Sequence, residues 1–523
     1  MTAGAGRRRP PARIAAGSAI WTAVMAAAGA LQTLAFVEGR TWPLPIATAA
    51  LLAWRVARVA PRRAAHDGFA YAFGWLGAGV WWLYISMHRY GGLPAWMAAL
   101  AVAALAAALA LYLALALAAA ARWRSGRPAI DALTFGAVWL GAELARGVLF
   151  TGFPWLASGY AQIDGPLAGL APWVGVYGIG AWAAVVAALA AAAWPPPGGR
   201  FVWRLLAAAA LLVLLPWPFD TLDFTRSTGT LEVALVQTNV PQDQKFAAEH
   251  VPEVLEAVAR DLLASRATLT VAPETAVPLL PSQLEELAPG YWATLAAAFG
   301  PERAALVGVP LGDFEHGYTN SVVALGGGSD GYRYDKWHLV PFGEFIPRGF
   351  RWFTELMQIP LGDFARGSRN PPSLRLGAQR IAPNICYEDL FGEELARRFG
   401  DAGAAPTLFA NVGNIAWFGD TIAVRQHREI SRLRTLEFQR PMLRATNTGA
   451  TAIIDHRGRV VAELAPYTRG VLTGVVDGRS GITPYAWWAS RAGLWPLALA
   501  AAGWLAVRAL AARVRSAAAG AAR

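Results

Sequence analysis

The residues best suited to chemistry in this chain are its single cysteine, one of its two lysines, Lys336, and one glutamate. Cys386 is the only cysteine and lies in the sequence Asn-Ile-Cys-Tyr-Glu-Asp. Of 46 basic residues, only Lys245 and Lys336 are lysine. Glu274 lies in Val-Ala-Pro-Glu-Thr-Ala-Val-Pro, directly after an apolar run that reads as a buried strand. A carboxylate, an ammonium group and a thiol are the parts of a site for nucleophilic acyl transfer.

Each of the three groups has a distinct task in such a site. The thiolate of Cys386 is the nucleophile. Glu274 takes the thiol proton and returns it to a leaving group, which requires burial to raise its pKa toward neutrality. Lys336 stabilises the oxyanion, together with the main-chain N–H that follows Cys386. Arginine would substitute poorly for this lysine, because its wide guanidinium would fill the space of the oxyanion.

Each residue taken alone also fits a simpler role. A lone cysteine at the end of a strand is usually a small core residue. A Pro-Glu-Thr turn is usually a polar loop, and a lone lysine is usually solvated. The catalytic interpretation depends on the three sequences occurring together.

The composition places these residues in a membrane protein. Hydrophobic residues make up 55% of the chain and charged residues only 15%, where soluble domains have about 25%. The apolar character is concentrated before residue 220 and in the last forty residues. We therefore expect a membrane domain at 1–220, an extracytoplasmic catalytic domain at 221–486, a closing transmembrane helix at 487–511 and a cytoplasmic tail at 512–523.

A membrane-spanning helix needs about 20 mostly apolar residues. The sequence predicts about eight such spans, at 14–37, 42–60, 68–87, 94–120, 130–150, 165–194, 201–219 and 487–511. Arginines cluster in alternate connections, which by the positive-inside rule places both termini in the cytoplasm and the insert outside. These flanks account for the net charge of +11, so the charge does not indicate a nucleic-acid partner.

The insert alternates between strand-like and helix-like segments, which predicts a layered α/β domain. The expected strands are 231–240, 267–273, 304–311, 320–325, 380–386, 407–412, 448–455 and 471–477. The expected helices are 248–265, 282–298, 391–399 and 420–438. Glu274 and Cys386 follow expected strands, a common position for site residues in α/β folds.

Several motifs resemble those of one known family. The Glu274 and Cys386 sequences, with Tyr-Asp-Lys-Trp-His-Leu-Val-Pro-Phe-Gly-Glu-Phe around Lys336, are similar to the Glu, Lys and Cys motifs of the nitrilase superfamily. Leu149-Phe-Thr-Gly-Phe-Pro-Trp-Leu and Val236-Gln-Thr-Asn-Val-Pro-Gln resemble its membrane-anchored branch, the apolipoprotein N-acyltransferases. The resemblance covers nearly the whole chain.

The resemblance implies a polytopic α-helical membrane domain joined to an αββα nitrilase-like sandwich. It also implies transfer of an acyl chain from a membrane phospholipid to the terminal amine of a diacylated apolipoprotein. The implied catalytic residues are Glu274 as base, Lys336 as oxyanion stabiliser and Cys386 as nucleophile. Residues that match supporting positions of the family are Glu344, Tyr387 and Glu388. No metal or other cofactor is implied.

Two positions depart from the family pattern. Phe246 stands where the family often has tryptophan, so a large ring remains available for a contact with lipid. The family sequence Asn-Asp-Ala-Trp-Phe-Gly has Ile415 in place of its acid, so no polar role is expected there. Asn414 and Trp417 remain candidates for lining the substrate site, with a simple structural role as the alternative.

Other residues have open interpretations. Glu143 and Arg146 are three residues apart near the end of a span, and fit either a functional site or a structural ion pair. His427 fits packing or capping better than catalysis. The apolar side chains expected either to enter lipid or to pack internally are Phe342, Phe345, Phe350, Trp352 and Phe353.

The chemistry implied by the resemblance is a two-step exchange through a thioacyl-enzyme at the outer face of a bacterial cytoplasmic (inner) membrane. One alternative is a membrane-tethered amidase or nitrilase that uses water as acceptor, although one span would then suffice as a tether. Another is a transporter whose insert only binds ligand, but paired broken helices are not evident in the two halves.

Overall fold

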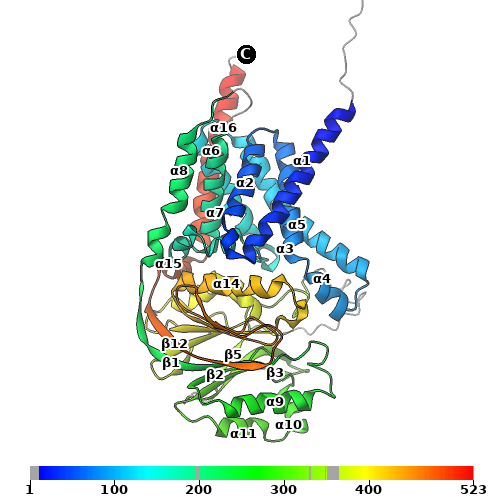
Figure 1. The fold of residues 1–523 in the computed structure, drawn as a ribbon, viewed down its shortest axis with the longest axis vertical. Helices are drawn as coiled ribbons and strands as arrows, with labels where there is room; N and C mark the ends of the chain where they lie inside the picture. The colour runs from blue at the N-terminus through cyan, green and yellow to red at the C-terminus, as the bar shows by residue number, and fades with distance from the viewer. Residues whose placement is uncertain (1–10, 195–198, 329–330, 348, 350–363, 522–523) are drawn as a thin grey trace, which may run out of the picture.

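The structure is a computed structural model that describes residues 11–194, 199–328, 331–347, 349 and 364–521. A helical bundle occupies one end of the molecule and an α/β domain the other (Figure 1). Helix α1 begins and helix α16 ends at the end of the bundle that is distant from the α/β domain. The two parts confirm the predicted fold class.

The described helices of the bundle correspond in order to the expected spans. They are α1 (Pro11–Gln32), α2 (Pro43–Val56), α3 (Pro61–Val80), α5 (Ala95–Trp123), α6 (Pro128–Val148), α7 (Ala171–Ala192), α8 (Trp203–Leu214) and α16 (Trp495–Ala521). Short helical segments connect them: η1 (Thr33–Phe36), η2 (Gly39–Thr41), α4 (Leu83–Ile85), η3 (Ser86–Tyr90), η4 (Leu149–Thr151), η5 (Ser158–Gln162), η6 (Pro166–Leu170), η7 (Trp217–Thr221) and α15 (Pro484–Ala492).

Six helices in the described part of the chain are long and apolar enough to cross a membrane, where the sequence predicted about eight. The two that differ are α2 and α3. Helix α2 has only 14 residues. Helix α3 begins at Pro61, earlier than expected, and so includes Asp67, whose buried carboxylate pairs with Arg55 at 2.9 Å and Arg63 at 2.8 Å. These charges lower the hydropathy of a helix that nevertheless packs inside the bundle.

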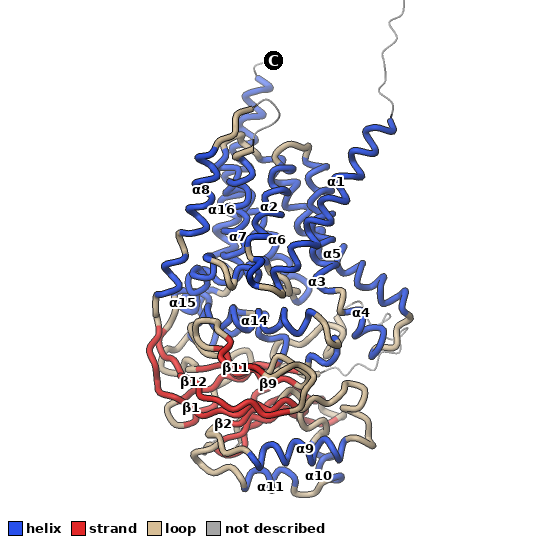
Figure 2. Tube along the Cα trace, in the orientation of Figure 1, coloured by secondary structure: helices blue, strands red, loops and turns tan. Residues whose placement is uncertain are grey.

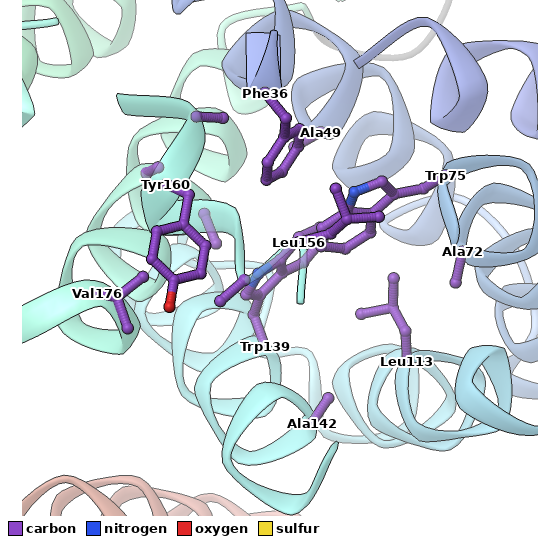
Figure 3. Close-up of a cluster of buried hydrophobic side chains, with 14 of the residues drawn as sticks. Phe36, Ala49, Ala72, Trp75, Leu113, Trp139, Ala142, Leu156, Tyr160 and Val176 are labelled. Carbon is purple, nitrogen blue, oxygen red and sulfur yellow. The ribbon is translucent and has the colours of Figure 1, made fainter. Parts of the chain in front are cut away.

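The bundle core combines large aromatic rings with close helix approaches. Trp75 of α3 and Trp139 of α6 stack with ring centroids 6.0 Å apart, and Leu156 lies beside them (Figure 3). A Cβ atom at Gly29 would lie 1.8 Å from the carbonyl oxygen of Tyr71, so only glycine allows α1 to approach α3 this closely. Such close contacts between small residues are a main source of helix association in membranes.

The α/β domain contains two six-stranded sheets among the described residues, packed face to face (Figure 2). The first sheet has the order β12-β1-β2-β3-β4-β5 and the second β11-β10-β9-β8-β7-β6. In each sheet the three central strands are parallel and the outer pairs antiparallel. The strands are β1 (Thr225–Gln237), β2 (Leu269–Val271), β3 (Ala304–Asp313), β4 (Gly317–Gly326), β5 (Arg333–Asp335), β6 (Leu374–Leu376), β7 (Gln379–Ile385), β8 (Leu408–Gly413), β9 (Met442–Thr446), β10 (Ala452–Ile454), β11 (Val460–Glu463) and β12 (Gly470–Gly481).

Helices cover the outer face of each sheet, which completes an αββα sandwich. The first sheet is covered by α9 (Val251–Ala264), α10 (Pro281–Leu287) and α11 (Tyr291–Ala297). The expected single helix at 282–298 is divided because Gly290 adopts a left-handed conformation with φ 73°. The second sheet is covered by α14 (Ile422–Phe438), with η8 (Cys386–Leu390), α13 (Gly392–Ala396), η9 (Arg397–Phe399) and η10 (Ile415–Phe418) nearby.

Helix α14 lies between the second sheet and the membrane bundle (Figure 1). Its Gln426 accepts hydrogen bonds from the indole N–H groups of Trp82, at 3.0 Å, and Trp155, at 2.9 Å. Glu437, near its other end, accepts the main-chain N–H of Val176 at 2.8 Å, where Gly175 interrupts α7 with φ 63°. The α/β domain is therefore joined to the bundle by buried polar contacts as well as by the chain.

Candidate active site

Glu274, Lys336 and Cys386 meet at one edge of the sandwich. Glu274 follows β2 and Lys336 follows β5 in the first sheet, whereas Cys386 follows β7 in the second. Nζ of Lys336 lies 3.6 Å from Oε1 of Glu274. The charges of both residues act on the thiol of Cys386. The structure therefore brings the three residues into one site, and the role of each stays a prediction.

Cys386 occupies a tight turn at the end of its strand. Its φ of 51° is left-handed, which is uncommon for a residue with a side chain and is typical of strained functional positions. Its carbonyl oxygen accepts a hydrogen bond from Nδ2 of Asn411 at 3.2 Å, and Nε2 of His427 lies at the same distance. Burial, and next the negative charge of Glu274, raise the pKa of the thiol, whereas Lys336 opposes this shift. The resting residue is therefore a thiol that needs a base.

The carboxylate of Glu274 is held in one orientation. Its Oε1 accepts a hydrogen bond from Nδ2 of Asn320 at 2.7 Å, and its Oε2 accepts the main-chain N–H of Asn414 at 2.8 Å. The same N–H of Asn414 favours the ionised form of Cys386. One main-chain donor thus lies between the candidate base and the candidate nucleophile.

Lys336 is buried and fully paired. Nζ donates to Oε1 of Glu344 at 2.9 Å, nearer than the contact with Glu274. Although burial disfavours its charge, Glu344 and then Glu274 raise the pKa of Lys336, so it remains an ammonium ion. Glu344 is itself held by Asn320 Nδ2 at 2.8 Å and by the N–H of Val340 at 2.8 Å. A fixed positive charge therefore stands beside the thiol.

Glu388 connects the segment after Lys336 to the strand before Cys386. Its Oε1 accepts the N–H groups of Trp337 at 2.7 Å and His338 at 3.1 Å. Its Oε2 accepts the N–H of Ile385 at 2.7 Å and the hydroxyl of Tyr334. Burial raises the pKa of Glu388. The carboxylate fixes the spacing between the two sheets at the site.

Tyr387 connects the nucleophile turn to the membrane domain. Its hydroxyl donates to the carbonyl oxygen of Gly152 at 3.1 Å, in the connection after α6. That connection contains two left-handed non-glycine residues, Phe150 with φ 54° and Thr151 with φ 75°. Arg146 holds it by donating to the carbonyl oxygens of Phe153 at 2.9 Å and Trp155 at 2.6 Å.

The remaining predicted site residues differ in their exposure. Asn414 is buried and donates from Nδ2 to Gln242 at 2.8 Å, so it belongs to the polar network around Glu274. Phe246 is 53% exposed and Trp417 is 38% exposed, and Trp417 packs edge-on against Tyr90 of η3 with centroids 5.7 Å apart. The two rings are available to contact apolar ligands.

The structure shows the surroundings of the residues whose roles the sequence left open. Glu143 accepts the N–H of Ser158 at 2.7 Å and lies 3.6 Å from Arg146, which is the structural ion pair. His427 is buried and lies 3.0 Å from Asp389 Oδ1, beneath the turn of Cys386. Phe342 is exposed and Phe345 partly buried. Phe350, Trp352 and Phe353 lie outside the described residues.

Sequence reasoning missed three polar residues that hold Glu274. Asn320 bridges Glu274 and Glu344, and Gln242 contacts Asn414. Lys245 donates from Nζ to the main-chain oxygen of Glu274 at 2.8 Å. The scarcity of lysine in the chain was a signal for Lys245, and Gln242 ends the Val236-Gln-Thr-Asn-Val-Pro-Gln motif, whereas no local pattern marked Asn320.

These contacts assemble what acyl transfer requires. The site has a thiol that can be deprotonated, an oriented carboxylate to accept the proton, and a fixed ammonium group to stabilise an oxyanion. In the described ranges, no cluster of three histidine, cysteine or acidic side chains is arranged to hold a metal ion.

Comparison with known proteins gives matches along most of the chain. Residues 28–189 match the apolipoprotein N-acyltransferase N-terminal domain, and residues 232–485 match the carbon-nitrogen hydrolase family. The apolipoprotein N-acyltransferase of Verminephrobacter eiseniae is 51% identical over 479 residues, covering 87% of this chain and 89% of that protein. Those of Ralstonia nicotianae and Pseudomonas syringae pv. tomato are 47% and 38% identical, covering 87% and 90% of this chain and 88% and 93% of theirs.

Proposed function

This chain belongs to the apolipoprotein N-acyltransferase family, and we propose that it transfers a fatty acyl group from a membrane phospholipid to the terminal amine of a diacylglyceryl-cysteine in an apolipoprotein. The observation that carries the proposal is the combination of two features. Cys386 lies beside a buried Lys336 held by Glu274 and Glu344, and the domain that contains them packs on membrane-spanning helices.

In the first step, Glu274 accepts the proton of the Cys386 thiol as the sulfur attacks the ester carbonyl of the phospholipid. The ammonium group of Lys336 stabilises the oxyanion that forms. As the intermediate collapses, the carbon–oxygen bond of the ester breaks and Glu274 passes the proton to the leaving lysophospholipid. The acyl group remains on sulfur as a thioester.

In the second step, the amine of the lipoprotein attacks the thioester carbonyl. A carbon–nitrogen bond forms and the carbon–sulfur bond breaks. Glu274 removes the proton of the amine and returns it to the sulfur, which restores the thiol. A thioester suits this exchange because an amine opens it readily.

The proposed setting is the bacterial cytoplasmic (inner) membrane, with both termini in the cytoplasm and the catalytic domain on the periplasmic side. Arginines before α1 and in alternate connections support this orientation through the positive-inside rule. A phospholipid ester is embedded in the bilayer, and the position of α14 against the bundle keeps the domain at the membrane surface.

Intact-mass measurement after incubation with phospholipid vesicles tests the proposal. We expect the wild-type protein to gain the mass of one fatty acyl group, and to lose it when a diacylated lipopeptide with a free amine is added. The lipopeptide should gain the same mass. Cys386→Ala should show neither change, and acylation by that variant would refute the assignment of the nucleophile.

The same experiment separates the alternatives. Release of free fatty acid, with the lipopeptide unchanged, would indicate an amidase-like hydrolase. Failure of the wild-type protein to gain mass or to turn over would indicate a domain that only binds ligand. Either result would refute the proposed transfer.

A further inference from the structure

Both lysines of the chain contact Glu274, but at different atoms. Lys336 approaches the carboxylate, 3.6 Å from Oε1, whereas Lys245 donates to the main-chain oxygen at 2.8 Å. Because the chain uses arginine at nearly every other basic position, the convergence of both lysines on one glutamate indicates that a compact ammonium group is required at each.

Lys245 is a buried cation whose ammonium group donates to a main-chain oxygen. Its side chain is 3% exposed, and within the described ranges no carboxylate forms an ion pair with it. Burial lowers the pKa of Lys245 to about 8, although the negative charges of Glu274 and Cys386 oppose the shift. Burial of a charge that forms no ion pair is costly, so the retention of Lys245 points to a task other than stability.

The main chain at Glu274 offers such a task, because it forms a tight turn whose position must be held. Thr275, the next residue, has a left-handed φ of 46°. A Cβ atom at Gly308 of β3 would lie 2.3 Å from the carbonyl oxygen of Pro273 and 2.8 Å from the Cα atom of Glu274, so the turn packs directly on the neighbouring strand. The carbonyl of Glu274 is fixed by Lys245.

The segment that carries Lys245 also reaches the carboxylate of Glu274. The main-chain N–H of Lys245 donates to the carbonyl oxygen of Pro241 at 3.0 Å, and this hydrogen bond closes a turn over residues 241–245. Gln242 of that turn accepts from Asn414, whose own N–H binds Oε2 of Glu274. Phe246, the residue that follows Lys245, is exposed. The turn therefore holds Glu274 by two routes and ends at a ring accessible to ligand.

We propose that Lys245 is a positioning residue for Glu274: its ammonium group holds the carbonyl of Glu274 so that the carboxylate keeps its orientation toward Cys386. The inference rests on the proposed acyl transfer.

Lys245→Met tests this role, because methionine has a similar length but no donor. Removal of a buried charge that forms no ion pair within the described ranges is expected to preserve the fold, with a thermal unfolding midpoint close to that of the wild type, because the cost of burying the charge and the hydrogen bond to Glu274 are lost together. The rate of thioacyl formation at saturating phospholipid should fall roughly 10- to 100-fold, since small misplacements of a reacting group have effects of this size. KM for phospholipid should change less than about twofold.

Two further measurements separate positioning from a general structural effect. Alkylation of Cys386 by iodoacetamide requires the thiolate but no base acting on a substrate, so in Lys245→Met it should fall by clearly less than thioacyl formation does, with the loss of the nearby positive charge accounting for the decrease. The matched control is Gln244→Met, on an exposed residue of the same turn, and it should acylate at the wild-type rate.

Unchanged thioacyl formation in Lys245→Met, with wild-type protein active, would refute the inference and leave the proposed function standing. Loss of acylation together with a strongly lowered unfolding midpoint and an equally large loss of alkylation would also refute it, because a loosened fold would then be the cause. Inactive wild-type protein would instead refute the proposed function.

Discussion

Nζ of Lys336 lies 2.9 Å from Oε1 of Glu344, closer than it lies to the carboxylate of Glu274. The lysine is therefore shared between two acids, and Asn320 donates to both of them. This arrangement keeps one positive charge in place while Glu274 gains and loses a proton, because Glu344 supplies the second negative charge that stabilises the ammonium ion.

Glu344→Gln is expected to reduce the rate of acyl transfer without preventing it. The substitution removes the nearer negative charge from Lys336 and leaves the N–H of Val340 without its carboxylate acceptor. The ammonium group is then less firmly placed, and we expect the rate of thioacyl formation to fall roughly tenfold or more. Single-turnover mass spectrometry measures this rate. The control Glu285→Gln, on an exposed residue of α10, should have wild-type activity, and equal rates in both variants would contradict the role of Glu344.

The reactivity of Cys386 should respond in opposite directions to loss of its two charged neighbours. Glu274 raises the pKa of the thiol and Lys336 lowers it. At a fixed pH below that pKa, the thiolate fraction changes about tenfold for each unit of pKa. Glu274→Gln should therefore speed alkylation of Cys386 by iodoacetamide while it abolishes acyl transfer. Lys336→Met should slow both reactions.

Alkylation rates measured between pH 7 and pH 10 provide the check. In the wild-type protein the rate should keep rising across this range, because a raised pKa leaves the thiol mostly protonated at neutral pH. A rate in Glu274→Gln equal to or below that of the wild type would mean that the carboxylate does not act on the sulfur.

The three central site residues could be predicted because each is marked in the sequence itself. Cys386 and Lys336 are scarce residue types, and Glu274 follows an apolar run. Their meeting could not be read from the sequence, because Glu274 and Lys336 follow β2 and β5, which are not neighbours in the first sheet, and Cys386 follows β7 of the second. Glu388 was marked only by resemblance, and its role in joining Trp337 to Ile385 depends on contacts between two sheets that no local pattern specifies.

Residues that support the site through distant contacts were not predictable. Asn320 lies in the middle of a pairing between two strands, 46 residues from Glu274, and its sequence context is that of an ordinary strand. In the membrane domain, hydropathy alone suggested that α3 starts later than it does. Asp67 is buried near the start of this helix because it pairs with Arg63 of the same helix and with Arg55 of α2, a compensation that involves two helices.

The orientation of the catalytic domain can be tested with its single cysteine. A membrane-impermeant maleimide added to intact spheroplasts should label Cys386 if the domain lies on the periplasmic side, and pretreatment with iodoacetamide should prevent labelling. In a Cys386→Ala background, the control Ala518→Cys near the chain end should be labelled only after lysis. Labelling of Cys386 only after lysis would reverse the proposed topology.

Gln426→Leu is expected to weaken the junction between the α/β domain and the bundle. The substitution removes the acceptor of the Trp155 indole N–H and the donor to the carbonyl oxygen of Gly79, whereas Trp82 keeps a second acceptor in Gly79 at 2.9 Å. A buried donor left without a partner costs about 1–3 kcal/mol. We expect the thermal unfolding midpoint in detergent to fall by several degrees, measured from intrinsic tryptophan fluorescence.

The same variant also tests whether the junction positions the active site. His427, the neighbour of Gln426, contacts both the carbonyl of Cys386 and Asp389, so a shift of α14 displaces the support of the nucleophile turn. The rate of acyl transfer by Gln426→Leu should therefore be reduced even at temperatures at which the variant remains folded. Arg425→Leu, at an exposed position on the same helix, should retain both stability and activity. Full activity of Gln426→Leu would show that the domain keeps its active-site geometry without this contact to the bundle.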